Sequence, residues 1–272
     1  MANTKKLGLA LGSGAFKGLF HVGLIRSLVK NHIPIDYISG TSAGAIVGAH
    51  YALFQDLDRL ENFVTNHKYE KLMALLAPSF RSGLVKSDKM YAFWKSVFGQ
   101  ATFNDLKIPF NAVATDLLSG QPEVIKVGYL AKAVQASMSI PTLLEPTIMN
   151  GRPLVDGFLS NPVPDDVAKK MGADVVLSVN LDNYERHDDF DPGKMSMLQV
   201  SLRSFEIMRH SIAKHSIQNT DLLIEPPGLY EYESWQEYFV GKKVESLIKM
   251  GEDTMDVNLP TLLKLLNVSN ER

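Results

Sequence analysis

The stretch Ile35-Asp36-Tyr37-Ile38-Ser39-Gly40-Thr41-Ser42-Ala43-Gly44 runs directly into an apolar, small-residue helix pattern over Ala43–Leu53. Ile35–Ser39 has the apolar character of a buried strand, so Gly40–Gly44 is predicted to be a tight turn between a strand and a helix. A serine at the centre of such a turn, with glycine two positions away on each side, is typical of a nucleophile elbow. The positive end of the following helix would favour negative charge near Ser42. A plain strand–helix connection is the alternative, and the flanking elements favour the functional interpretation.

The composition narrows the classes of protein that the chain can be. Its 272 residues are 45% hydrophobic and 21% charged, which is ordinary for a folded globular protein and unlike a disordered one. A net charge of −2 provides no basic field, so we expect no nucleic-acid partner. The absence of cysteine excludes disulfides, cysteine-ligated metals and thiol catalysis.

Membrane and targeting signals are weak. No stretch reaches the roughly 18–20 apolar residues that a spanning helix needs. Lys5-Lys6 followed by Leu7–Leu11 resembles the start of a signal peptide, but Gly12-Ser13-Gly14 interrupts it. We therefore expect a buried first strand and a cytoplasmic protein, with peripheral membrane contact left open.

Short apolar runs alternate with helical patterns along the chain, which predicts an α/β fold with a mainly parallel sheet. Tyr184–Lys194 is predicted to be a polar surface loop. The expected strands are Leu7–Leu11, Ile35–Ser39, Phe110–Ala114, Val124–Val127, Pro153–Val155, Asp174–Asn180 and Leu222–Ile224, and the expected helices are Leu19–Val29, Ala43–Leu53, Tyr129–Ser137, Pro164–Met171 and Met195–Ser216, before a helical tail.

A second glycine-rich turn, Gly12-Ser13-Gly14-Ala15-Phe16-Lys17-Gly18, also joins a predicted strand to a predicted helix. Its successive N–H groups would form an anion-binding nest. Three interpretations compete: a dinucleotide site with Asp36 as the ribose-binding acid, a structural turn, or an oxyanion hole that serves Ser42. The nucleotide interpretation leaves the turn at Ser42 unexplained.

A serine needs a base before it becomes a good nucleophile. None of the seven histidines has the setting of a triad histidine; His21 is predicted to be buried and structural, and His210 and His215 are predicted to be solvated. Asp156, in Leu154-Val155-Asp156-Gly157, ends a short apolar strand, where partial desolvation would raise its pKa and improve it as a base. Taken alone, an Asp-Gly pair is more typical of a plain turn.

Together these residues resemble the patatin-like phospholipases, in particular the compact bacterial members. Five blocks match in order: Leu9–Gly18, Ile35–Ala45, Ala114–Leu117, Ala136–Pro141 and Val155–Gly157. The resemblance implies a three-layer α/β/α patatin-like fold, one domain over residues 1–272 with its core motifs in 7–171, and a C-terminal continuation over 172–272 that becomes helical.

The resemblance also implies a Ser–Asp dyad of Ser42 and Asp156. Gly40 and Gly44 then flank the nucleophile elbow. Ser13, Gly14, Ala15 and Lys17 stand where the family has its oxyanion loop and basic residue.

The chain departs from the family's usual pattern in two ways. Ser13 and Ala15 replace glycines, which narrows the backbone's access to positive φ. Phe158 follows Asp156-Gly157 where the family usually has Gly or Ala. Both departures bear on substrate range more than on activity, because neither removes a catalytic side chain.

The predicted function is a serine-dependent lipid acyl hydrolase: a phospholipase A, lysophospholipase or carboxylesterase that needs no metal and no cofactor. One alternative is a weak or inactive relative that binds acyl lipid or a protein partner; a nucleotide-binding oxidoreductase is another. Residues 68–100 could cover the site, and the aromatic tail around Trp235 could sit at a lipid surface, although core packing is the more ordinary role of both. Ser137, Ser139 and Asp116 are expected to shape loops near the site. The sequence leaves the oligomeric state open.

Overall fold

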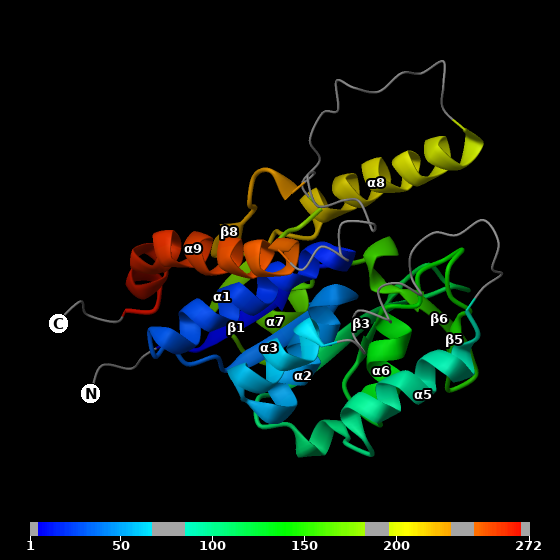
Figure 1. Cartoon of the computed structure of the whole chain (residues 1–272), viewed down its shortest axis with the longest axis horizontal. Coiled ribbons are helices and arrows are strands. Elements are labelled where there is room, and N and C mark those ends of the chain that lie inside the picture. Colours follow the sequence, from blue (N-terminus) through cyan, green and yellow to red (C-terminus); the bar gives the residue numbers. More distant parts are fainter. Residues whose placement is uncertain (1–4, 67–84, 183–195, 230–241, 268–272) are drawn as a thin grey trace.

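The computed structural model describes residues 5–66, 85–182, 196–229 and 242–267 (Figure 1). The strands are β1 (Leu7–Leu11), β2 (Tyr37–Thr41), β3 (Phe110–Asp116), β4 (Pro122–Ile125), β5 (Thr147–Met149), β6 (Arg152–Asp156), β7 (Val175–Val179) and β8 (Leu222–Ile224). The helices are α1 (Leu19–Lys30), α2 (Ala43–Phe54), α3 (Leu57–Thr65), α5 (Ser87–Phe98), α6 (Leu130–Ser137), α7 (Asp165–Met171), α8 (Met197–His215) and α9 (Lys242–Leu265), with short 3-10 turns η1 (Ala15–Gly18), η2 (Phe103–Asp105) and η3 (Gly157–Leu159).

The described strands form one sheet in the order β5-β6-β3-β2-β1-β7-β8, with β4 also paired to β3. The run from β3 through β2, β1 and β7 to β8 is parallel throughout. The strands β4, β5 and β6 pair antiparallel at the other end of the sheet. The prediction of an α/β fold with a mainly parallel sheet is confirmed.

Helices cover both faces of this sheet, and β1 shows why. Its leucines face one large core, which they share with α1, α2 and α9. Gly8 and Ala10 face the opposite side, where a Cβ on Gly8 would lie 2.6 Å from that of Ala173, beside α7. A strand with apolar residues on both faces has to be covered on both, so the three-layer α/β/α arrangement follows from β1.

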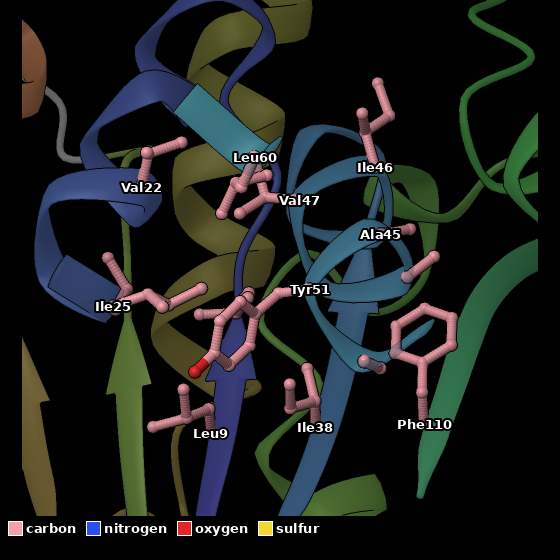
Figure 2. Packing of buried hydrophobic residues seen from close by; sticks show 14 of the residues in the cluster. Leu9, Val22, Ile25, Ile38, Ala45, Ile46, Val47, Tyr51, Leu60 and Phe110 are labelled. Atoms are coloured by element: carbon pink, nitrogen blue, oxygen red, sulfur yellow. The ribbon is translucent and has the colours of Figure 1, made fainter. Parts of the chain in front are cut away.

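The larger core lies between the sheet and the helices α1, α2 and α3. Figure 2 shows Tyr51 of α2 reaching down towards Leu9 of β1 and Ile38 of β2. Every residue of α2 before Phe54 is buried, which explains its composition of small and apolar residues. A helix that is apolar all round is an interior helix, and α2 is therefore held firmly at its N-terminal end, directly after Ser42.

Most expected elements are present with shifted ends. Strand β2 lies two residues later than predicted, at Tyr37–Thr41, so it runs right up to Ser42. Strand β4 starts at Pro122 instead of after it, since Pro122 pairs at the end of the ladder. Three elements had no counterpart in the sequence prediction: α3, α5 and the three-residue strand β5.

Several expectations fall wholly or partly outside the described residues. Of the stretch 68–100, helix α5 is described, and its Met90, Trp94 and Phe98 are buried in the main core, as ordinary packing requires. The loop Tyr184–Lys194 and the tail around Trp235 lie outside the described residues. One domain over 1–272 stays a prediction. Among the helices of the described ranges, none combines the length and the apolar content needed to cross a bilayer.

Candidate active site

Strand β3 brings two strand ends together. Ala112 pairs with β4 on one edge and with Gly40 of β2 on the other, and Ala114 pairs with β4 and with Asp156 of β6. Because β4 occupies one edge, β2 and β6 must share the other. They run in opposite directions and both end there, with Thr41 beside Val113 and Asp156 beside the next residue. The sheet therefore sets Ser42, one residue past β2, against the last residue of β6.

The turn at Ser42 has the backbone of a nucleophile elbow. Ser42 has φ 54° and ψ −116°, a conformation that is costly for a residue with a side chain. The flanking glycines are required by close approach: a Cβ on Gly40 would lie 2.5 Å from Gly44 O, and one on Gly44 would overlap Leu11 O. Helix α2 begins at Ala43, so the serine side chain projects from the helix N-terminus.

Ser42 and Asp156 are in contact. Ser42 Oγ donates a hydrogen bond to Asp156 Oδ2 at 2.7 Å. The other carboxylate oxygen accepts the N–H of Phe158 at 3.0 Å, which fixes the carboxylate plane. Asp156 is fully buried and Ser42 is 5% exposed. The structure thus brings together the two residues that the sequence predicts as nucleophile and base.

Burial raises the pKa of Asp156 to about 7, in spite of the hydrogen bonds from Phe158 N–H and Ser42 Oγ, which favour the charged carboxylate. An acid with a pKa near neutrality holds a proton strongly enough to accept one and weakly enough to release it again. The sequence predicts that desolvation raises the pKa of Asp156, and the complete burial of this carboxyl provides that desolvation.

The glycine-rich loop packs directly beside the elbow. A Cβ on Gly18 would lie 2.5 Å from that of Ala43, and Gly12 O would lie 2.8 Å from a Cβ on Gly44. The N–H of Ser13 donates to Pro162 O at 2.8 Å and the N–H of Lys17 to Gly14 O at 3.0 Å. Within the described part of the chain, the N–H groups of Gly14 and Ala15 donate to no acceptor. Of the four predicted loop residues, these two keep backbone donors for a ligand.

Ala15 takes the backbone conformation of a glycine. Its φ is 49°, in the left-handed region. Gly14 is in tight contact, since a Cβ there would lie 2.9 Å from the side chain of Leu181. At Ala15 the chain therefore carries a side chain in a backbone conformation that favours glycine.

A comparison with protein families gives a match that covers this whole arrangement. A family model described as patatin-like phospholipase matches residues 9–169, which include the loop, the elbow and Asp156. The chain belongs to the patatin-like phospholipase family. The resemblance seen in the sequence is confirmed.

Curated relatives of this chain are similar to it over only part of their own length. An uncharacterized NTE family protein of Mycobacterium tuberculosis is 32% identical over 185 residues, which cover 68% of this chain and 51% of that protein. Lysophospholipase NTE1 of Pyricularia oryzae is 31% identical over 197 residues, covering 66% of this chain and 12% of that protein. The chain thus spans about half the length, or less, of these curated relatives.

The fold of this patatin-like protein has a solved counterpart. The crystal structure of VipD from Legionella pneumophila covers 97% of this chain and 67% of its own, with a TM-score of 0.54 and 15% identity. At that identity the likeness supports the fold alone.

Two serines, one at the C-terminal end of helix α6 and one just after it, support the site. Ser137 Oγ accepts the N–H of Ser42 at 2.9 Å and donates to Val113 O at 2.6 Å. Ser139 O accepts the N–H of Asp156 at 3.0 Å. The sequence predicts only loop shaping for both serines, and it gives no sign that Ser137 holds the backbone of the nucleophile itself.

Among the hydrogen bonds of the described residues, none joins Lys17 or the histidines singled out in the sequence to Ser42 or Asp156. Lys17 is buried at 6% exposure. His21 is buried as predicted, donates from Nε2 to Gly12 O at 2.8 Å, and burial lowers its pKa to about 4. His210 is not simply solvated, since its Nδ1 lies 3.0 Å from Asp182 O. None of the described histidines bonds to Ser42 or Asp156, and in the same ranges no three His, Asp or Glu side chains gather as a metal site requires.

Proposed function

We propose that this chain hydrolyses acyl esters of lipids, with Ser42 as nucleophile and Asp156 as general base. The observation that carries the proposal is the 2.7 Å hydrogen bond from Ser42 Oγ to Asp156 Oδ2 at a strained, glycine-flanked turn. Family membership and a relative named lysophospholipase support the lipid ester as substrate class.

In the proposed acylation, ionised Asp156 accepts the proton of Ser42 as Oγ forms a bond to the ester carbonyl carbon. The carbonyl oxygen becomes a tetrahedral oxyanion. When this intermediate collapses, the bond to the leaving alcohol breaks, and Asp156 returns the proton to that alcohol. The acyl group is then held as an ester on Ser42.

The oxyanion needs donors that are already in place. The N–H of Ser42 is engaged with Ser137 Oγ, so it is not the donor. The N–H groups of Gly14 and Ala15 stand without a described acceptor beside the elbow, and we assign them this role. One such donor typically lowers the barrier by about 3 kcal/mol in the transition state. We assign Lys17, which is buried in the same loop, to holding that loop or adding positive charge.

Deacylation repeats the same steps with water as nucleophile. Asp156 takes a proton from water, the hydroxide attacks the acyl carbonyl, and the proton passes to Ser42 Oγ as the acyl-enzyme bond breaks. The products are a fatty acid and the regenerated hydroxyl. A phospholipid, a lysophospholipid and a simple carboxylic ester all fit this chemistry.

The proposed nucleophile can be tested with a fluorophosphonate probe, which labels only an activated serine. Wild type should be labelled and Ser42→Ala should not. Ser178→Ala is a matched control, because Ser178 is a fully buried serine that bonds to Thr220 instead of a carboxylate. Labelling that persists in Ser42→Ala would refute the assignment. A folded wild-type protein that resists the probe would favour the alternative of a relative that binds acyl lipid without turnover.

The substrate class is tested by fatty-acid release from three substrates: vesicles of phosphatidylcholine, micelles of lysophosphatidylcholine, and a short p-nitrophenyl ester. We expect release from at least one lipid, at a rate that depends on Ser42. Hydrolysis of the short ester alone would reduce the proposal to a carboxylesterase.

A further inference from the structure

Asp182, which follows β7, is tied to the oxyanion loop. Its Oδ2 accepts a hydrogen bond from Ser13 Oγ, and both residues are buried. The adjacent Leu181 packs on Gly14, and the N–H of Gly12 donates to Val179 O at 3.1 Å. Three consecutive loop residues are therefore held by the end of β7 and the residues just after it.

Asp182 is in turn held by helix α8. Arg209 Nε lies 2.7 Å from Asp182 Oδ1, with side-chain exposures of 23% for the arginine and 1% for the aspartate. The guanidinium also lies over the ring of Phe158, 5.9 Å from its centroid. Phe158 is the residue whose N–H orients the carboxylate of Asp156. Contacts thus run without a break from the oxyanion loop, through one ion pair, to the turn that carries the base.

We propose that Asp182 and Arg209 are positioning residues of the reaction, which hold the oxyanion loop and the turn after Asp156 in a fixed relation to each other. This inference rests on the proposed function, since it assigns the two residues to the geometry of that same site. Neither side chain touches the reacting atoms.

The two charges also act on the base. The groups that face Asp156 are the Ser42 hydroxyl, the N–H of Phe158, and the more distant charges of Arg209 and Asp182. Burial raises the pKa of Asp156, Arg209 lowers that pKa, and Asp182 raises it. Because the two charges act on this pKa with opposite signs, removing either partner should shift the titration of Asp156, in opposite directions.

The first test measures this shift without using activity. The carboxyl carbon of Asp156 is followed by ¹³C NMR against pH in aspartate-labelled full-length protein, and Asp156→Asn assigns the signal. Asp182→Asn should lower the pKa of Asp156, and Arg209→Gln should raise it, each by about half a unit. Asp165→Asn is the matched control, because Asp165 is an equally buried carboxylate that bonds to Asn219 and Thr220. Shifts of the same sign, or shifts no larger than that of the control, would overturn the electrostatic part.

The second test measures the loop. Hydrogen exchange of the peptide that covers residues 12–18 should speed up in Asp182→Asn and in Arg209→Gln, and should stay unchanged in Asp165→Asn. Arg209→Lys keeps the charge and should restore much of the protection. Unchanged exchange in both variants of the pair would overturn the positioning role.

The third test measures the steady-state kinetics of ester hydrolysis. Both substitutions should lower kcat about tenfold and leave KM within about twofold, because they disturb transition-state geometry and leave ground-state binding intact. A change confined to KM would count against positioning. If wild type shows no Ser42-dependent turnover, the proposed function fails, while the NMR and exchange results still decide whether the pair holds the loop.

Discussion

Among the residues that the structure describes, two Ser–Asp pairs are buried on both sides, and they differ in what surrounds the carboxylate. Ser42 and Ser13 follow neighbouring parallel strands, β2 and β1, and each donates its hydroxyl to an aspartate that lies at or just beyond the end of another strand. Asp182 has Arg209 at 2.7 Å, whereas Asp156 has a backbone N–H as its other close partner.

The difference explains why one pair suits catalysis and the other suits structure. Asp182 is engaged in an ion pair with Arg209 and therefore links the serine of the loop to helix α8. Burial raises the pKa of Asp156 to about 7, which suits a group that has to accept a proton and release it again. The serines differ too, since Ser42 has φ 54° on an elbow. The same two residue types are therefore proposed as a nucleophile with its base in one place and as a loop anchor in the other.

The largest expected effect separates the two serines. Ser42→Ala should reduce ester turnover by more than about a thousandfold, because it removes the proposed nucleophile. Ser13→Ala should reduce it by about tenfold, because the loop N–H groups remain and only their anchor is lost. Initial rates on one ester are compared at matched circular dichroism. Equal losses in the two variants would erase the distinction between the pairs.

The pH dependence of turnover sharpens the role of the first aspartate. Asp156 has to be ionised to accept a proton, and its pKa is about 7. Turnover per unit substrate should therefore fall about tenfold for each pH unit below 7 and level off above 8. The measurement is kcat/KM from pH 5 to 9 with a neutral ester. A profile that is flat down to pH 5 would mean that another group is the base.

The stability of the fold should respond with opposite signs at the two aspartates. The folded-state pKa of Asp156 lies above its ordinary value of 3.8, so the folded protein binds this proton more tightly than the unfolded chain does. The contribution of this proton to stability is therefore fully present below about pH 4 and is lost as pH rises through 7. An asparagine side chain has no such proton to lose, so Asp156→Asn should raise the free energy of unfolding at pH 8 by about 2–4 kcal/mol.

The matched variant Asp182→Asn should lower that free energy at pH 8, because it leaves Arg209 without its carboxylate partner. Urea unfolding at pH 8 and pH 5 measures both. For Asp156→Asn the gain should shrink at pH 5. A gain that is the same at both pH values would show that it does not come from the proton on Asp156.

The residues that can be predicted from the sequence are those that short motifs carry. Gly40–Gly44 and the glycine loop each indicate their chemistry within a few positions. Asp156-Gly157 alone is more typical of a turn, and the pairing of Ser42 with Asp156 is what the resemblance to the family implies. The ion pair that anchors the loop cannot be found in this way, because Ser13, Asp182 and Arg209 are far apart in the chain and their types are ordinary at each position. Only the parallel pairing of β1 with β7 brings the first two together.

The same distinction holds for the strands: those with a local apolar pattern can be predicted, and those that depend on pairing with a distant strand cannot. Strands with continuous apolar runs, such as β1 and β8, are predicted to the residue. Strand β5 escapes prediction because its three residues owe their pairing to β6 and have no pattern of their own. The predicted ends of β2 are wrong by two residues, since Gly40 and Thr41 look like turn residues and yet pair with β3.

The smallest expected effect tests the loop's backbone at Ala15. A side chain at φ 49° costs about 1–2 kcal/mol relative to glycine, and a glycine there costs up to about 1 kcal/mol more in chain entropy on folding. The two nearly cancel, so Ala15→Gly should change the free energy of unfolding by less than about 1 kcal/mol and should leave turnover within about threefold. Ala15→Val is the informative partner, because a branched side chain is far less tolerant of positive φ. If valine is tolerated as well as glycine, the loop does not need the left-handed conformation at this position, and the assignment of the Ala15 N–H to the oxyanion loses its geometric basis.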